Sequence, residues 1–320
     1  MLLDIKNLTI HYVTDGGTVK AVNNLNFSLK KGEAMGFVGE TGAGKTTTAL
    51  GIMRLVPNPP GKIIGGEIFL DGVDLVKKSE AEMRSIRGSK VSMIFQDPMT
   101  SLNPVIPVRN QIAEVISLHE KVTAAEALAK AEKILDMVGI RAERAKDFPH
   151  QFSGGMRQRV VIAIALACNP KLLIADEPTT ALDVTIQAQV LELMRNLKKE
   201  FDTSMIMITH DLGIVAEICD KVAIMYAGSV VETAEKLELF NNPKHPYTIG
   251  LFNSIPDIDK DEDILKPIKG LMPDPTDLPS GCPFHPRCDA AKPECSNTEP
   301  GNVEVSENHF VKCLLFNHER

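Results

Sequence analysis

The chain has 320 residues, of which 43% are hydrophobic and 24% charged, and its formal net charge is −7. This length suits a full α/β domain with a smaller appendage, and the composition is that of an ordinary soluble globular protein. The acidic balance argues against a nucleic-acid partner, because proteins that coat nucleic acid usually carry a basic surface. The start, MLLDIKNLTIHY, does not resemble a secretory signal, and the longest apolar stretch, Val160 to Cys168, is far too short to span a bilayer.

A glycine-rich loop, GETGAGKTT, follows the strand-like segment EAMGFV and precedes the helix-like segment TTTALGIMRLV. Glycines in such a loop let successive N–H groups surround a phosphate, and the positive end of the next helix favours the same anion. In this pattern Lys45 reaches the β- and γ-phosphates, and the Thr46 hydroxyl binds Mg²⁺. The sequence therefore predicts a nucleotide site made by Gly39, Glu40, Thr41, Gly42, Ala43, Gly44, Lys45, Thr46 and Thr47.

The region from about 98 to 158 is predicted to be helical. One helix is expected to begin at Thr123, which has Glu126 three residues later in the spacing of a capping box. Apolar residues at helical spacing follow it and predict a buried stripe. The segment FSGGMRQR, from Phe152 to Arg159, places a turn of small residues before another helix, so its N–H groups and the Ser153 hydroxyl predict a second anion-binding end.

An apolar run ending in two acids, LLIADEP, extends from Leu172 to Pro178. It predicts a buried parallel strand whose carboxyl end lies at the phosphate crevice. Asp176 is then expected to hold Mg²⁺, and Glu177 to act on the attacking water, either as general base or by polarising it. Taken alone, an acidic strand end is equally well an ordinary surface feature; the phosphate loop favours the catalytic interpretation.

FSGGMRQR resembles the signature motif of ATP-binding-cassette (ABC) ATPases, and further family elements follow in the expected order over residues 1 to about 235. The resemblance implies that ATP and Mg²⁺ are the cofactors. It implies that Gln96 senses the γ-phosphate and Mg²⁺, and that His210 contacts the γ-phosphate as the switch histidine. Tyr12 is a candidate for stacking on adenine, although a lone tyrosine in a first strand is as often a packing residue.

In that family the ATP is held between two chains. The resemblance implies that the signature residues Ser153, Gly154 and Gly155 bind the γ-phosphate of the nucleotide on the other subunit, and that Asp183 crosses the interface. Because the chain has one phosphate loop and one signature motif, we expect it to dimerise. The helical region is expected to dock onto a membrane subunit.

Three stretches resemble the ATPases of dipeptide, oligopeptide and nickel importers: DPMTSLNP, HPYTIGLFNSIP and LPSGCPFHPRC. DPMTSLNP and the methionine in FSGGMRQR resemble the D-type subunit. This implies a heterodimer with a paralogous F-type ATPase, whereas an isolated chain is either a homodimer or a monomer. It also implies two separate membrane permeases, an extracellular substrate-binding protein that acts indirectly, and a peripheral position on the cytoplasmic face of the membrane. Peptides are the expected substrate, with nickel or sugars as alternatives. A metal- or redox-sensing regulatory ATPase is the alternative of another class.

The tail contains eleven of the 20 prolines between Pro243 and Pro300, and four of the six cysteines. Disulfides are disfavoured in a cytosolic chain, so clustered thiols predict a metal centre. No pair has the two-to-four-residue spacing typical of structural zinc, so we expect a [4Fe–4S] cluster with a structural role on Cys282, Cys288, Cys295 and Cys313, with Zn²⁺ as the alternative. Nothing in the sequence suggests that the tail contacts ATP.

The expected fold is therefore α/β. It has a P-loop NTPase core of the ABC ATPase type, an antiparallel β subdomain, an α-helical signature subdomain and a loop-rich, metal-binding C-terminal extension. The expected domains are the nucleotide-binding domain over 1–235 and the extension over 236–320.

Overall fold

The computed structural model describes residues 1–180, 182–254 and 267–317, which fall into two compact units. The first unit contains residues 1–3, 29–34 and 69–208. The second contains residues 4–28 and 35–68 and the chain from residue 209 onward. Residue 181 of TTALD and residues 255–256 of HPYTIGLFNSIP lie outside the described residues. In the described part of the chain, no helix has both the length and the apolar character needed to cross a membrane.

The first unit is built on a parallel sheet, in which β7 (Leu172–Asp176) lies between β6 (Val91–Ile94) and β8 (Ser204–Ile208). All five residues of β7 are buried, as expected for a central parallel strand covered on both faces. Helix α6 (Gly154–Leu166) contacts β6 and α7 (Val184–Glu200). The short strand β5 (Val73–Asp74) and helix α2 (Glu80–Ile86) precede this sheet.

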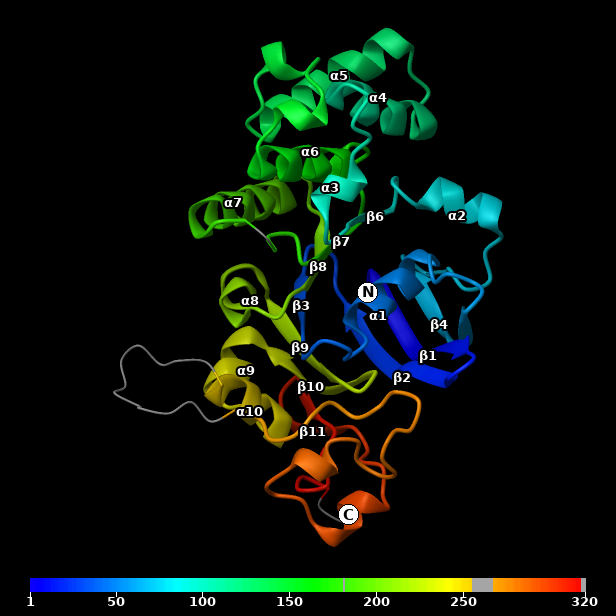
Figure 1. Cartoon of the computed structure of the whole chain (residues 1–320), viewed down its shortest axis with the longest axis vertical. Helices are drawn as coiled ribbons and strands as arrows, with labels where there is room; N and C mark the ends of the chain where they lie inside the picture. Colours follow the sequence, from blue (N-terminus) through cyan, green and yellow to red (C-terminus); the bar gives the residue numbers. More distant parts are fainter. Residues whose placement is uncertain (181, 255–266, 318–320) are drawn as a thin grey trace. The chain divides into compact units, whose positions relative to one another are not determined.

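A run of helices connects β6 to β7, and α4, α5 and α6 lie side by side in it (Figure 1). Thr123 begins α5 with the expected capping box, because its side chain accepts from the Glu126 N–H while the Glu126 carboxylate accepts from the Thr123 N–H. Ala131 and Leu135 of α5 are buried toward its neighbours. The elements between β6 and β7 are, in chain order, α3 (Pro98–Ser101), α4 (Val108–His119), α5 (Ala124–Met137), the 3₁₀ turns η1 (Ala142–Arg144) and η2 (Pro149–Gln151), and α6.

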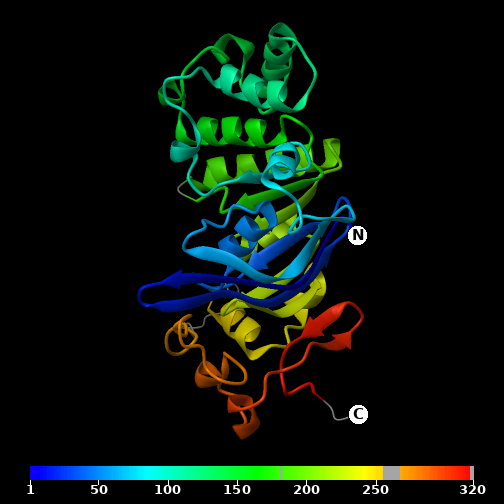
Figure 2. The ribbon, with the colours of Figure 1, turned by 90° about the vertical axis from the view of Figure 1, so that its right-hand side faces the viewer.

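In the second unit, β3 (Ala34–Val38) pairs in parallel with β9 (Lys221–Tyr226), and β10 (Ser229–Glu235) pairs antiparallel with β9. Helix α8 (Leu212–Ile218) packs closely on β3, since a Cβ on Gly36 would lie 2.8 Å from Val215. A separate sheet has the order β2 (Gly17–Leu29), β1 (Leu3–Thr14), β4 (Gly61–Leu70), with β1 and β2 forming the long hairpin in Figure 2. Helix α1 (Lys45–Met53) follows β3.

The C-terminal extension starts with α9 (Lys236–Asn241) and α10 (Pro246–Asn253) and continues as loops with the turns η3 (His285–Arg287) and η4 (Pro293–Ser296). The expectation of a loop-rich tail holds for this part. The chain then forms a hairpin of β11 (Val303–Ser306) and β12 (His309–Val311), and β12 adds to the edge of β10. His309 is fully buried on this hairpin, and its Nε2 lies 2.7 Å from the buried carboxylate of Glu232. The tail therefore continues the sheet of the second unit.

Candidate functional site

The phosphate loop joins the buried strand β3 to α1 and depends on its glycines. Gly42 and Gly44 have φ of +87° and +98°, in the left-handed region that glycine adopts without strain. A Cβ on Gly44 would lie 2.5 Å from the carbonyl oxygen of Ala21, whereas a Cβ on Gly42 would meet nothing within 4 Å. Backbone packing therefore requires glycine at 44, while the space beside Gly42 is open.

Lys45 lies over this loop. Its Nζ donates to the carbonyl oxygen of Gly39 at 2.6 Å and to that of Glu40 at 3.1 Å, and only 8% of the residue is exposed. Thr46 is exposed in the first turn of α1. Its hydroxyl is a hard oxygen donor of the type that Mg²⁺ prefers. The loop thus offers N–H groups, an ammonium group and a hydroxyl to a phosphate–magnesium ligand.

Gln96 and Glu177 come together in the first unit. They follow the neighbouring parallel strands β6 and β7, whose register pairs Ile94 with Ala175. The Nε2 of Gln96 donates to Oε2 of Glu177 at 3.0 Å, and Thr180 Oγ1 donates to the same oxygen at 3.0 Å. Glu177 has a left-handed φ of +47°, and its N–H donates to the carbonyl oxygen of Ile208 at 2.8 Å. The backbone of Glu177 is therefore held in a strained conformation that persists only in a well-determined site.

Asp176, the last residue of β7, is 3% exposed. Carboxylate oxygens are hard donors of the type that Mg²⁺ prefers. The structure therefore places at the end of this strand a buried carboxylate suited to a hard cation, followed by the more accessible Glu177.

The signature segment begins α6. Ser153 is the N-cap and accepts from the N–H of Met156 at 3.4 Å. Gly155 is required by packing, since a Cβ there would lie 2.3 Å from a methyl carbon of Ile186 in α7. Asp183 in turn caps α7 by accepting from the N–H of Ile186 at 3.0 Å. Ser153 and Gly154 are exposed, so the first turn of α6 is accessible to a ligand.

His210 and Tyr12 are placed in the second unit. His210 is exposed, and the next residue, Asp211, is the N-cap of α8. Tyr12 is half-buried, and its ring lies directly against Gly61, where an added Cβ would be 2.7 Å from a ring carbon. Packing alone accounts for this position of Tyr12, so adenine stacking stays a prediction.

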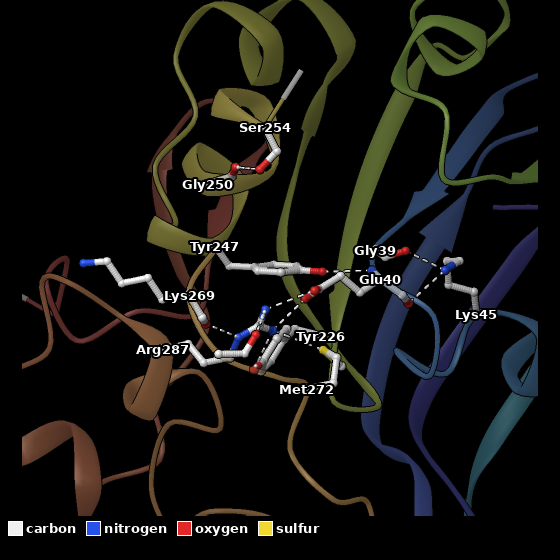
Figure 3. A network of polar contacts seen from close by, with 11 residues as sticks. Gly39, Glu40, Lys45, Tyr226, Tyr247, Gly250, Ser254, Lys269, Met272 and Arg287 are labelled. Atoms are coloured by element: carbon white, nitrogen blue, oxygen red, sulfur yellow. Dashed lines mark hydrogen bonds and ion pairs between the residues drawn. The ribbon is translucent and has the colours of Figure 1, made fainter. Parts of the chain in front are cut away.

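The tail contacts the phosphate loop, and the sequence did not indicate this contact. Two tail residues reach the phosphate loop: Arg287 forms two hydrogen bonds with the Glu40 carboxylate, and the Tyr247 hydroxyl accepts from the Glu40 N–H (Figure 3). Both are buried beside Tyr226 of β9. The acidic residue at position 40 was the one feature of the loop that a cation elsewhere in the chain could have matched.

The four tail cysteines line one pocket together with apolar neighbours that include Phe284. All are free thiols, and burial raises the pKa of Cys313 to about 11 and also raises the pKa values of Cys282 and Cys288. Among the residues that the structure describes, no group of three or more His, Cys, Asp or Glu side chains could hold a metal ion. A single ion requires donors within about 2.0–2.3 Å of one centre. The predicted metal-binding tail is therefore not supported, and the zinc alternative does not fit the arrangement of these thiols.

Comparison with known proteins supports the interpretation of these motifs. Residues 22–180 match the family described as ABC transporter, and residues 231–295 match the family described as oligopeptide/dipeptide transporter, C-terminal region. The oligopeptide transport ATP-binding protein OppD of Bacillus subtilis is 53% identical over 98% of this chain and 88% of its own length. The dipeptide transport ATP-binding protein DppD of the same organism is 48% identical over 98% of this chain and 94% of its own length.

Solved structures of ATP-binding cassettes share the fold of this chain. A dimeric ATP-binding cassette in a post-hydrolysis state, bound to ADP and phosphate, superposes with a TM-score of 0.66 at 27% identity, over 73% of this chain and 98% of that one. CbiO1 of Clostridium perfringens superposes with a TM-score of 0.64 at 27% identity, over 75% of this chain and 91% of that one. The predicted α/β fold of an ABC ATPase and the predicted ATP-hydrolysing transporter subunit are confirmed. The chain belongs to the ATP-binding subunits of ABC transporters, in the branch that carries the oligopeptide/dipeptide transporter C-terminal region.

Proposed function

We propose that this subunit hydrolyses ATP to drive the import of dipeptides or longer peptides through separate membrane permeases, from the cytoplasmic face of the membrane. The observation that carries the proposal is the hydrogen bond between Gln96 and Glu177, which joins the expected γ-phosphate sensor to the expected general base. The relatives named for oligopeptide and dipeptide transport support peptides as the substrate class, rather than nickel or sugars.

The proposed roles follow from the chemistry of each group. The loop N–H groups and Lys45 bind the phosphates, and Thr46, Gln96 and Asp176 supply oxygen ligands to Mg²⁺. Glu177 accepts the proton of the attacking water, and His210 donates a hydrogen bond to the γ-phosphate. Tyr12 stacks on the adenine.

The proposed active form is a dimer in which Ser153, Gly154, Gly155 and Asp183 act on the nucleotide of the partner chain. Support comes from the exposed N-terminus of α6 and from the similarity to a cassette solved as a dimer. The partner that we propose is a paralogous F-type ATPase, with two permeases and, indirectly, an extracellular substrate-binding protein completing the transporter. We assign the nucleotide-binding domain to 1–235, with a β subdomain and a helical subdomain over about 98–158, and the extension to 236–320.

Reconstitution of the full transporter in proteoliposomes tests this function. Uptake of a labelled tripeptide should require ATP and be abolished in E177Q, and labelled Ni²⁺ or sugar should not be taken up. ATPase activity should rise when the permeases and the loaded binding protein are added. Uptake of Ni²⁺ or sugar but not of peptide would reassign the substrate. ATPase activity indifferent to the permeases but dependent on the redox state of the tail would favour the regulatory alternative.

For the tail, we propose that the four thiols lining one pocket hold a [4Fe–4S] cluster, whose core is larger than a single ion and takes four cysteine thiolates. The cluster would brace a segment that has little apolar core of its own. Protein purified without oxygen should be brown and carry about four iron and four sulfide per chain, and C288S should bleach it. The proposal is contradicted if the wild-type protein is colourless and metal-free and if its tail resists protease no better than the tail of C288S.

A further inference from the structure

The phosphate loop carries a carboxylate where a polyanionic ligand binds. Glu40 directly follows Gly39, and its carbonyl oxygen is one of the two that accept from Lys45 Nζ. The Glu40 side chain is 31% exposed, so solvent screens its charge only in part. A carboxylate within a few ångströms of a triphosphate repels it, and partial burial strengthens that repulsion. Compensation of this charge would therefore strengthen the binding of ATP by the loop.

Arg287 supplies the compensation. Its Nη1 lies 2.7 Å from Oε2 of Glu40 and its Nη2 lies 3.0 Å from Oε1, which is the paired geometry that a guanidinium forms with a carboxylate. The Arg287 side chain is 5% exposed. This pair is therefore much less solvated than an ordinary surface ion pair, and it fixes the orientation of the carboxylate as well as its charge.

The extension holds Arg287 in place with groups of its own. Nε donates to the carbonyl oxygen of Lys269 at 2.8 Å and Nη2 to that of Gly270 at 3.3 Å. The guanidinium carbon lies 5.8 Å from the ring centre of Tyr226. The hydrogen bonds with Glu40 raise the pKa of Arg287 above its ordinary value, so the cation is permanent. Arg287 is thus anchored in the tail independently of its contact with the loop.

Tyr247 holds the backbone at the same residue. Its hydroxyl accepts from the Glu40 N–H at 2.9 Å, and its fully buried ring packs against Tyr226 with centroids 4.6 Å apart. The N–H and the carboxylate of Glu40 are therefore both bound by the extension, while its carbonyl oxygen is bound by Lys45 (Figure 3). All three hydrogen-bonding groups of this residue are fixed.

From this geometry we infer that Arg287 is a positioning residue for nucleotide binding: it neutralises and orients Glu40 so that the phosphate loop accepts the triphosphate. The C-terminal extension is then part of the ATP site and sets its affinity. Arg287 acts through Glu40 and needs no contact with the nucleotide. The inference rests on the proposed role of this loop as the ATP site.

Titration of the purified full chain with MgATP and MgADP tests the inference. R287Q should weaken MgATP binding about tenfold, the scale of one partly screened like-charge interaction, and weaken MgADP binding less because it carries less charge. Removing the carboxylate as well should restore most of the lost affinity, so R287Q/E40Q should bind MgATP within about threefold of wild type. K292Q is the matched control, because it removes an exposed cation of the tail at the N-cap of η4, and it should bind MgATP within twofold of wild type.

The rescue separates a charge effect from a structural one. If Arg287 only braced the tail through the carbonyl oxygens of Lys269 and Gly270, E40Q would restore nothing, and that result overturns the inference. Equal MgATP affinity of R287Q and wild type overturns it too. If R287Q does not fold, R287K is measured instead, with an expected loss of about threefold and the same rescue by E40Q, because lysine keeps the charge but not the paired hydrogen bonds. A wild-type chain that binds no MgATP at all would instead refute the assignment of the loop as the ATP site.

Discussion

Gln96 donates a hydrogen bond from Nε2 to Oε2 of Glu177 at 3.0 Å, although the two residues are 81 positions apart in the sequence. Gln96 lies two residues before Pro98, the first residue of α3, and α3 contacts α6, the helix that begins with the signature segment. A movement of the helical region can therefore reach the Glu177 carboxylate through one side chain.

The first prediction concerns the general base. E177Q should bind MgATP nearly as tightly as wild type but lower kcat at least about 100-fold, because an amide cannot accept the proton of the attacking water. The variant should also accumulate as an ATP-bound dimer with its partner. Phosphate release and size-exclusion chromatography with ATP measure the two effects.

The matched control for this change is E192Q, which makes the same substitution at an exposed position of α7. It should hydrolyse ATP at the wild-type rate. Near-normal turnover by E177Q would contradict the role given to Glu177, whatever its effect on the dimer.

The second prediction concerns the sensor glutamine. Q96A removes a hydrogen bond that orients the base, and it also removes a proposed ligand of Mg²⁺, so kcat should fall about 10- to 100-fold. Because Gln96 is exposed and outside the packed core, the thermal midpoint should change little. Steady-state kinetics over a range of Mg²⁺ concentrations measure the loss. An unchanged kcat with a lower thermal midpoint would indicate a structural role only.

The local motifs predicted the phosphate loop, the buried strand before Asp176 and the capping box at Thr123, because each is fixed by residues close together in the sequence. The β11–β12 hairpin was not predicted. Its strands are short, and His309 points into the core toward Glu232, so the alternation of apolar and polar residues that marks a strand is interrupted. Its stability depends on the edge of β10, whose Glu232 pairs with Val311, and no local pattern in the sequence reveals this distant pairing.

The contact of Arg287 with Glu40 was missed for a related reason. The two residues are 247 positions apart, and each belongs to a motif that was interpreted separately. A carboxylate in a phosphate loop predicts that a cation compensates it, but the sequence does not indicate which of its 35 lysines and arginines does so. The zinc alternative failed in the opposite way. The clustering of cysteines in the sequence indicated that the four thiols lie together, and they do line one pocket, but their spacing could not specify the geometry that a single metal ion requires.

The third prediction compares two glycines of the phosphate loop. Both have left-handed backbones, so alanine at either position costs about 1–2 kcal/mol of unfolding free energy in strain. G44A also places its Cβ 2.5 Å from the Ala21 carbonyl oxygen, whereas G42A meets no atom within 4 Å. G44A should therefore lower the thermal midpoint clearly more than G42A in the absence of nucleotide. Equal midpoints would show that the loop relaxes around Ala21.

The last prediction concerns Ser153, which caps α6 and is proposed to bind the partner's γ-phosphate. S153A should cost about 1 kcal/mol of stability through the lost cap. T123A removes the cap of α5 in the same unit and should cost a similar amount, so it is the matched control. In the E177Q background, S153A but not T123A should also reduce the amount of ATP-dependent dimer. Both hydroxyls are exposed, but Ser153 alone of the two is proposed to face the partner's nucleotide. Analytical ultracentrifugation with and without ATP measures dimer formation, and chemical denaturation measures stability. If both variants lose the dimer equally, Ser153 acts only as a helix cap.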